Sequence, residues 1–380
     1  MSRRFPISLN PFAWAGPSST DYPTVNPDGT RWNFQPEPER IVAIGDLHGN
    51  LEALCNILLE RALINEEGKW IGENSHLVLM GDLVGGHKHS RLLLNFVMRL
   101  EEEAKARGSR VHAILGNHDI LPVQKNFRKF SLSEKKFYKE YPVPGAEGTK
   151  VHHAFRGNAL YAKWIRERNT MVQIGDTLFV HAGIGTWALH ALPDAINATV
   201  RAWVRFWQGI AEKPPKKTVW AAGRPEDERG SDSETGPVWL RAFREVRSSD
   251  GNQPKEGPSK EELEQILSKL AVKRVVVGHS PVSSAEIVTS HPYYQDRIVM
   301  IDTRVSDEKH GTLSALEIRG EILTTHYPET SKGAEELVKR ELAYLKDPVL
   351  PKVPLISSLL DSVSETSERL MESLKTFLDD

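Results

Sequence analysis

The sequence is poor in cysteine: its 380 residues contain only one, Cys55. A single cysteine excludes a disulfide within one chain and favours a reducing compartment. Cys55 lies between Leu54 and Leu58 in a helical apolar pattern. We therefore interpret it as a small buried hydrophobic residue rather than a nucleophile.

Long apolar runs are also lacking. No stretch of about 18 apolar residues occurs, which excludes a transmembrane span. The N-terminal Met-Ser-Arg-Arg-Phe-Pro is not followed by the apolar run that a secretory signal needs. We therefore expect a cytoplasmic protein with no membrane partner.

The sequence has no marked excess of either charge. Lys and Arg number 49 and Asp and Glu number 51, for a net charge of -2. Nucleic-acid-binding domains usually carry a basic patch and a high pI. The charge balance therefore gives no support for a nucleic-acid partner.

What the sequence does contain is a repeated unit, in which a short apolar run ends in polar residues and a helical pattern follows. Residues 41–44 form the first run and end at Gly45-Asp46, and a helix is predicted from Leu51 to about Leu63. Further apolar runs occupy residues 76–80, 111–115, 177–180, 274–277 and 298–301. Strands that alternate with helices predict an α/β architecture.

The chain divides into three predicted parts. Residues 1–38, rich in Pro, Gly, Ser and Asn, predict an N-terminal arm, and residues 39–330 the main catalytic domain. Residues 331–380 predict a helical extension, in which residues 356–377 carry apolar side chains at heptad spacing. That stripe predicts a helix that either mediates self-association or folds back onto its own domain.

Two segments interrupt the repeated unit and are interpreted as insertions that wall the site. Residues 122–170 are charged and aromatic, and residues 186–270 contain five tryptophans among Pro-rich and charged loops. Substrate choice usually resides in such segments on a rigid scaffold. The tryptophans either stack against an aromatic leaving group or form the core of the insertion.

The apolar runs end in side chains that could bind metals. These are Asp46, His48, Asp82, Asn117, His181 and His279. In open α/β sheets ligands bind at the carboxyl ends of the strands, so we expect the six side chains to meet at one rim. Carboxylate, amide and imidazole ligands without a thiolate suit Mn, Fe, Zn or Co rather than a structural zinc.

Six ligands fit two divalent ions that share one carboxylate. Two ions about 3.5–4 Å apart clamp the attacking and leaving oxygens of a displacement at phosphorus and lower the pKa of a bridging water. A lone histidine at a strand end is more often structural. The prediction therefore depends on all six side chains converging.

The motifs around these residues resemble the calcineurin-like metallophosphoesterase superfamily over about residues 41–325. The motifs are Gly45-Asp46-Leu47-His48-Gly49-Asn50, Gly81-Asp82, Gly116-Asn117-His118-Asp119, His181-Ala182-Gly183 and Gly278-His279-Ser280. The resemblance implies a four-layer α-β-β-α sandwich, two mixed sheets flanked by helices, with helical insertions.

Two details favour one branch of that superfamily. Gly278-His279-Ser280-Pro281 has one histidine where many metallophosphoesterases have two, which is similar to the phosphoprotein phosphatases. The stretch Gly236-Pro237-Val238-Trp239-Leu240-Arg241 resembles their Shewanella-like branch.

The resemblance also implies roles for the residues. Asp46, His48 and Asp82 would hold one metal, and Asp82 with Asn117, His181 and His279 the other. Attack would come directly from a hydroxide that bridges the two metals, without a phosphoenzyme.

Further roles follow from the same resemblance. His118 would donate a proton to the leaving group. Arg241 and Asn117 would bind the phosphate, and Asp302 would support the site from behind the ligands.

The chain departs from the family pattern after Asp82. Gly85 stands where the family has the Asp that orients the catalytic histidine, and Gly86 where it has an Arg that clamps phosphate. His118 would then be oriented by Asp119 or by water. Three basic residues either supply the missing positive charge or face solvent: His87, Lys88 and Arg91.

The sequence thus predicts a metal-dependent phosphatase for phosphate monoesters. The substrate is either a phosphoprotein, on Ser/Thr or Tyr, or a small-molecule phosphomonoester. Two alternatives stay open. The departure at residues 85 and 86 favours a weakly active phosphatase-like binding module, and the shared scaffold also allows a phosphodiesterase.

Overall fold

The computed structural model describes residues 33–34, 37–214, 221–222, 236–244, 257–307 and 309–346. The heptad stripe at residues 356–377 and most of the predicted arm at residues 1–38 lie outside the described residues. The proposed division into arm, catalytic domain and extension therefore stays a prediction.

One sheet is built from the first three apolar runs and a C-terminal hairpin. Its order is β10-β9-β2-β3-β4. The central strands β2 (Arg40–Ile44), β3 (Ser75–Leu79) and β4 (Arg110–Ala113) are parallel, as the repeated strand-helix unit predicts. Strands β9 (Ala315–Arg319) and β10 (Ile322–His326) extend the sheet antiparallel beyond β2.

The second sheet has the order β1-β5-β6-β7-β8. Strands β6 (Thr177–Val180), β7 (Arg274–Val277) and β8 (Ile298–Met300) are parallel and match the later apolar runs. Strand β5 (Met171–Ile174) runs antiparallel to β6, and the short β1 (Asn33–Phe34) pairs with β5. Both sheets therefore place parallel strands side by side.

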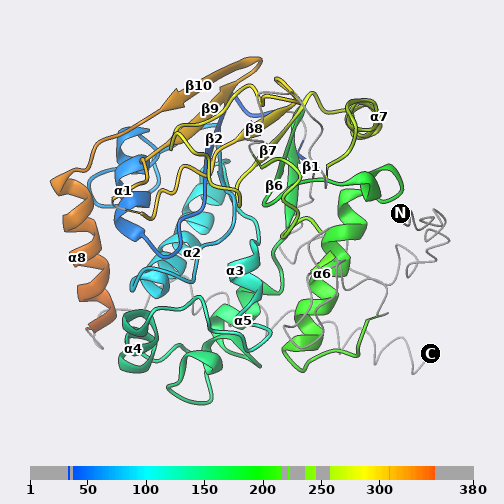
Figure 1. Cartoon of the computed structure of the whole chain (residues 1–380). Helices are drawn as coiled ribbons and strands as arrows, with labels where there is room; N and C mark the ends of the chain where they lie inside the picture. The colour runs from blue at the N-terminus through cyan, green and yellow to red at the C-terminus, as the bar shows by residue number, and fades with distance from the viewer. Residues whose placement is uncertain are drawn as a thin grey trace, which may run out of the picture.

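Helices cover the outer face of each sheet (Figure 1). Helices α1 (Leu51–Glu60), α2 (Ser90–Ala106) and α8 (Lys332–Lys346) pack on the β2-β3-β4 side. Helix α7 (Lys260–Leu270) and the 3-10 turn η2 (Thr186–Leu189) cover the other sheet. Among the described helices, none combines the length and apolar character that crossing a membrane demands.

The alternation of side chains between the two faces of each strand explains how the sheets and helices form layers. In β2, Val42 and Ile44 face the helices, while Ile41 and Ala43 join the cluster between the sheets. In β7, Val276 faces the same inner cluster from the other sheet. Because successive strand side chains point to opposite faces, each strand contributes to two cores. The fold is mixed α/β with two sheets and flanking helices, as expected.

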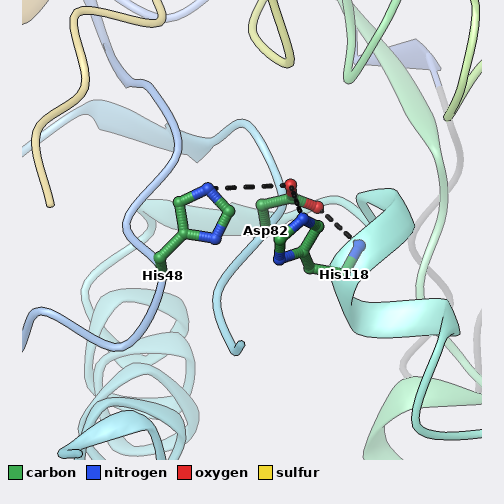
Figure 2. A group of neighbouring side chains, drawn as sticks. All are labelled: His48, Asp82 and His118. Atoms are coloured by element: carbon green, nitrogen blue, oxygen red, sulfur yellow. Dashed lines mark hydrogen bonds and ion pairs between the residues drawn. The ribbon is translucent and has the colours of Figure 1, made fainter. Parts of the chain in front are cut away.

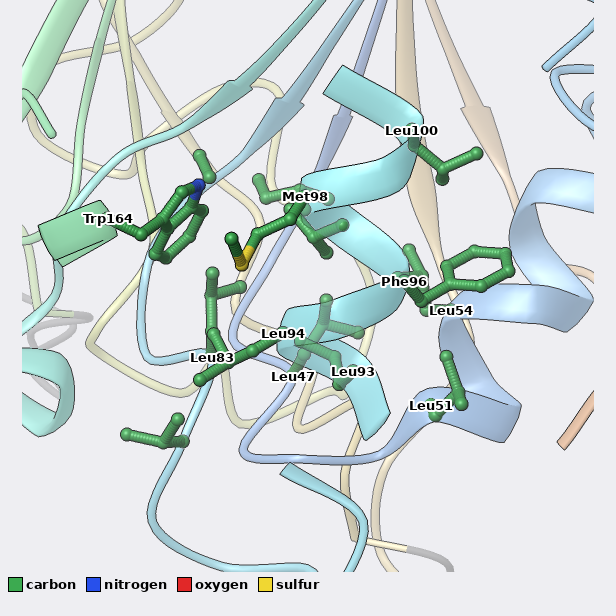
Figure 3. Close-up of a cluster of buried hydrophobic side chains, with 14 of the residues drawn as sticks. Leu47, Leu51, Leu54, Leu83, Leu93, Leu94, Phe96, Met98, Leu100 and Trp164 are labelled. Carbon is green, nitrogen blue, oxygen red and sulfur yellow. The ribbon is translucent and has the colours of Figure 1, made fainter. Parts of the chain in front are cut away.

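Part of the outer core lies where α1 meets α2 (Figure 3). Asn50 caps α1 by accepting the Ala53 N–H at 3.0 Å, and Leu51 and Leu54 then face Phe96 of α2. Fully burying one such side chain stabilises the fold by about 1.5–3 kcal/mol. This packing fixes the helices that follow β2 and β3, and with them the loops at the ends of these strands.

The two predicted insertions contain further helices. After α3 (Asn117–Ile120) the chain forms α4 (Leu132–Glu140), the 3-10 turn η1 (Val151–Phe155) and α5 (Leu160–Ile165). The second insertion contains α6 (Pro193–Trp207).

Two tryptophans of the second insertion and the single cysteine are buried. Trp187 and Trp203 are core residues, which supports the structural interpretation of those two tryptophans. Cys55 is buried as predicted, and burial raises the pKa of its thiol.

Candidate metal centre

The six predicted ligands lie at the carboxyl ends of five parallel strands. Asp46 and His48 follow β2, Asp82 follows β3, Asn117 opens α3 after β4, His181 follows β6 and His279 follows β7. His48 is half-buried and the other five are buried. The two sheets thus bring side chains from distant parts of the sequence to one rim.

Asp82 is shared by two groups whose atoms are close enough to hold an ion. One group is His48, Asp82 and His118, and the other is Asp82, His181 and His279. The Nε2 atoms of His48 and His118 lie 3.9 and 3.7 Å from Asp82 Oδ2 (Figure 2). His181 Nε2 lies 3.4 Å from Oδ1 of the same carboxylate. A single carboxylate between two groups is the arrangement expected of two ions that share a ligand.

Three acceptor atoms converge around His181. Its Nδ1–H donates to the Met80 carbonyl at 2.7 Å, which leaves a lone pair on Nε2 of the neutral ring. Burial lowers the pKa of His181, so the neutral ring prevails at pH 7. Its Nε2 then faces Asn117 Oδ1 at 3.1 Å and the Asp82 carboxylate. Converging lone pairs without a donor between them fit a cation.

Asp46 and His279 are linked directly. The backbone N–H of His279 donates to both Asp46 oxygens, at 3.1 and 3.2 Å. The side-chain Nε2 of His279 is buried and has no hydrogen-bond partner within the described residues. An unsatisfied buried imidazole nitrogen is costly unless it has a ligand, which again fits a metal. Asp46 belongs to neither of the two groups above, although the sequence assigned it to one.

The charges of the site are those of a cation-binding cluster. Burial, together with the nearby carboxylates of Asp302 and Asp82, raises the pKa of Asp46 well above its usual value. Burial also acts to raise the pKa of Asp82, but four surrounding histidines hold it below the ordinary range. Burial lowers the pKa of His48 to about 4. Neutral imidazoles beside crowded carboxylates are the ligand forms that divalent metals require.

The backbone at three ligands is unusual. His48, Asp82 and His279 have φ values of 43°, 49° and 61°, a left-handed conformation that non-glycine residues rarely adopt. A Cβ on Gly116 would lie 2.1 Å from Asp82 Oδ1, so the chain needs glycine there. Backbone strain of this kind gathers at functional sites.

His118 is oriented by the backbone. Its ring Nδ1–H donates to the Gly85 carbonyl at 3.2 Å, and its backbone N–H donates to Asp82 Oδ1 at 2.8 Å. Of the two alternatives for the orientation of His118, Asp119 or water, the one that named Asp119 is wrong. The Asp119 carboxylate instead accepts the N–H groups of Gly116, Leu83 and Val84 at 2.9, 2.9 and 3.3 Å.

Sequence reasoning missed Glu134 of α4. Its buried carboxylate accepts the N–H groups of Gly85 and Gly86 at 3.1 and 3.0 Å and the Ser90 hydroxyl at 2.6 Å. In sequence it stands in the charged run Ser133-Glu134-Lys135-Lys136, which reads as a solvated helix face. No sequence signal distinguishes it from its exposed neighbours.

Arg241 and Trp239 lie beside the second group. Arg241 is half-buried, and its Nη1 donates to the His279 carbonyl at 3.4 Å. The Trp239 ring stands edge-on to the His279 ring, with centroids 6.3 Å apart. Together they place one cation and one aromatic face at the rim.

The three basic residues after Gly86 differ in their surroundings. Lys88 is exposed and His87 half-buried. Arg91 is buried rather than solvent-facing, and its Nη2 donates to the Pro142 carbonyl at 2.8 Å. Of the two alternatives for Arg91, a solvent-facing position is therefore wrong, and a role in supplying positive charge stays a prediction.

Comparison with known proteins gives consistent results. The sequence model of the calcineurin-like phosphoesterase family matches residues 39–283. The chain is 27% identical to Shewanella-like protein phosphatase 2 of Arabidopsis thaliana, over 74% of this chain and 76% of that one. It is also 27% identical to Shewanella-like protein phosphatase 1 of Plasmodium berghei, over 73% and 69%.

Solved structures agree with the fold. A cold-active protein tyrosine phosphatase matches with a TM-score of 0.59 at 21% identity, covering 78% of this chain and 81% of that one. The cold-active protein-tyrosine phosphatase of a psychrophilic Shewanella species matches with a TM-score of 0.55 at 21% identity, covering 78% and 84%. At this level of identity the match is evidence for the fold alone.

Proposed function

Because this chain belongs to the calcineurin-like phosphoesterase family, we propose that it is a metal-dependent phosphatase that hydrolyses phosphate monoesters. The observation that carries the proposal is the Asp82 carboxylate, shared by two groups of potential ligands. The family consists of hydrolases, and the relatives above are named as phosphatases.

We assign the six residues predicted from the sequence as ligands of two divalent ions. Asp46, His48 and Asp82 would hold one ion; Asp82 with Asn117, His181 and His279 would hold the other. Such ions supply Lewis acidity, which lowers the pKa of the attacking water and offsets charge on the phosphate. Mn, Fe and Zn all suit this ligand set, and the choice among them stays a prediction.

The remaining chemistry falls to the chain's own groups. Arg241, beside His279, would bind the phosphate oxygens through its planar guanidinium, and Asn117 would contribute its amide. His118 would hold the proton that passes to the leaving oxygen. Since its Nδ1–H is bonded to the Gly85 carbonyl, Nε2 is the atom that would release this proton.

For the substrate we propose a phosphorylated protein. The names of the Arabidopsis and Plasmodium relatives support a phosphoprotein. Trp239, close to His279, provides an aromatic face against which a phenolic leaving group could stack. A small aromatic phosphate would use the same face, so both kinds of substrate belong in the assay.

The test is hydrolysis of an aryl phosphate by the full chain loaded with Mn²⁺. We expect turnover that Asp82→Asn abolishes, because that change weakens both groups at once. Glu140→Gln, at an exposed position of α4, serves as the control and should leave turnover unchanged. Metal content per chain is measured on the same samples.

Two other outcomes would contradict the proposal in different ways. A wild-type protein that binds two metals but turns over no monoester would be a phosphatase-like binding module. Faster turnover of phosphodiesters than of monoesters would point to a phosphodiesterase on the same scaffold.

A further inference from the structure

We propose that Glu134 positions His118 by acting through the peptide group that joins Gly85 to Gly86. This inference rests on the proposed phosphatase function and assigns to Glu134 the part that a directly bonded carboxylate would otherwise play. Glu134 is a positioning residue, since its carboxylate contacts neither the proposed ligands nor His118 itself in the described bonds.

One peptide unit carries both contacts. Its carbonyl, from Gly85, accepts the Nδ1–H of His118 at 3.2 Å. Its N–H, from Gly86, donates to Glu134 Oε2 at 3.0 Å. A continuous chain of hydrogen bonds therefore runs from the imidazole through the peptide to the carboxylate. The structure thus places a carboxylate behind His118 even though residue 85 has no side chain.

The other hydrogen bonds of Glu134 hold this series of hydrogen bonds in place. Oε1 accepts the Gly85 N–H at 3.1 Å and the Ser90 hydroxyl at 2.6 Å, so both carboxylate oxygens are engaged. The residue has no exposed surface. A buried carboxylate is costly unless it is well hydrogen-bonded, and here every donor named comes from the loop behind His118 or from the start of α2.

The arrangement has a chemical consequence for the imidazole. A carboxylate on the N–H of a peptide polarises its carbonyl, and bonds in such a chain strengthen one another. The polarised carbonyl fixes the proton on Nδ1 and stabilises positive charge on the ring. Because a carbonyl can only accept, Nε2 is left as the single position for the proton that moves.

A Cβ at position 85 would lie 2.9 Å from His118 Nδ1, and Gly85 has a φ of +85°. A side chain there would crowd the ring and strain the backbone. Gly85 is therefore part of this arrangement, because it lets the main chain come close enough for its carbonyl to accept the Nδ1–H of His118.

The test compares two substrates whose leaving groups differ in their need for a proton. p-Nitrophenyl phosphate has a good leaving group and needs little acid assistance, whereas phenyl phosphate has a poor one. In Glu134→Gln, one backbone N–H loses its carboxylate acceptor and the charge is gone. General acids contribute about 10²–10⁴-fold, so we expect kcat on phenyl phosphate to fall about tenfold and kcat on p-nitrophenyl phosphate less than about threefold.

Glu140→Gln, on the same helix but exposed, is the matched control and should change neither rate. Equal losses on both substrates in Glu134→Gln, or a drop in metal content, would mean a structural role and overturn the inference. An inactive wild-type protein would instead overturn the proposed function, so the two failures can be told apart.

A double-variant experiment tests the route of the effect. If Glu134 acts through His118, adding Glu134→Gln to His118→Asn should cause no further selective loss on phenyl phosphate. A further loss that is again selective would contradict the route. Should Glu134→Gln fail to fold, Ser90→Ala removes one partner of the carboxylate and should show a smaller loss, about threefold, with the same selectivity. A loss without selectivity in Ser90→Ala would overturn the inference.

Discussion

Two groups of histidines lie in different surroundings. His76 of β3 and His112 of β4 are buried, with Nδ1 of His76 and Nε2 of His112 3.1 Å apart, and Phe34 packs against both rings. In the second group, four histidines that follow the ends of β2, β4, β6 and β7 surround Asp82.

The difference between the groups is the carboxylate. His76 and His112 can satisfy each other, and the charges that act on the pKa of this pair come from Arg110 and Arg168. Around Asp82 the imidazoles instead face one shared acceptor. Burial alone thus does not make a histidine a ligand, whereas convergence on a carboxylate provides the donor set of a metal site.

The largest contrast in activity should come from removing one histidine from each group. We expect His279→Ala to lower kcat/KM about 10³-fold, since a lost Lewis acid is worth several kcal/mol. His112→Gln should lower kcat/KM less than about threefold, because that pair lies away from the reacting groups. Steady-state kinetics and metal content check both. Similar losses in the two variants would remove the distinction between the groups.

A second contrast uses the glycines at the two ends of β4. Gly116→Ala would place a Cβ 2.1 Å from Asp82 Oδ1, so we expect the carboxylate to shift and activity to fall about 100-fold. Gly108, with a φ of +70°, has no atom within 4 Å of an added Cβ. Gly108→Ala should cost about 1–2 kcal/mol of stability and leave activity unchanged. Loss of activity in Gly108→Ala but not in Gly116→Ala would contradict the placement of the site at the Gly116 end of β4.

Metal removal should lower the free energy of unfolding only through the group of side chains around Asp82. At a free metal concentration 100 times Kd, bound metal stabilises the fold by about 2.7 kcal/mol, so a chelator should lower the free energy of unfolding by a comparable amount. In Asp82→Asn the chelator should have little further effect, whereas in His112→Gln it should act as in the wild type. Urea titrations with and without chelator decide the point. An unchanged midpoint in the wild type would argue against bound metal.

The smallest expected effect is the part of the pH dependence of stability that comes from His76. Burial, with a contribution from Arg110, lowers the pKa of His76 from 6.5 to about 4. Between these values the unfolded chain binds the proton more readily, so the contribution of His76 is complete above about pH 6.5 and lost as the pH falls towards 4. In His76→Gln we expect the loss of stability between pH 7 and pH 5 to be about 2 kcal/mol smaller than in the wild type. Identical pH dependence in urea titrations would contradict the buried neutral state of His76.

Much of the fold could be predicted from local pattern. The six apolar runs that end in polar residues became β2, β3, β4, β6, β7 and β8, with bounds that differ by at most two residues. The pattern is informative because a strand buried on both faces must be apolar throughout. The pairing of β1 with β5 could not be predicted, since two residues carry no periodicity.

The site divides in the same way. Asp46, Asp82, His181 and His279 were recognisable because they follow apolar runs, and the structure gathers them at one rim. The partner that orients His118 was expected to be Asp119 or water, and the structure shows the Gly85 carbonyl in that place. A backbone carbonyl is present at every residue, so no residue letter marks the one that is used.

The sequence by itself determined which side chains are potential metal ligands, because ligand chemistry depends on residue type and the strand ends mark its place. Only the tertiary structure decided that His48 and His279 adopt left-handed backbone and that Glu134 reaches the loop behind His118. The position of Glu134 depends on how α4 packs against the start of α2, and such long-range packing leaves no mark in the neighbouring residues of the chain.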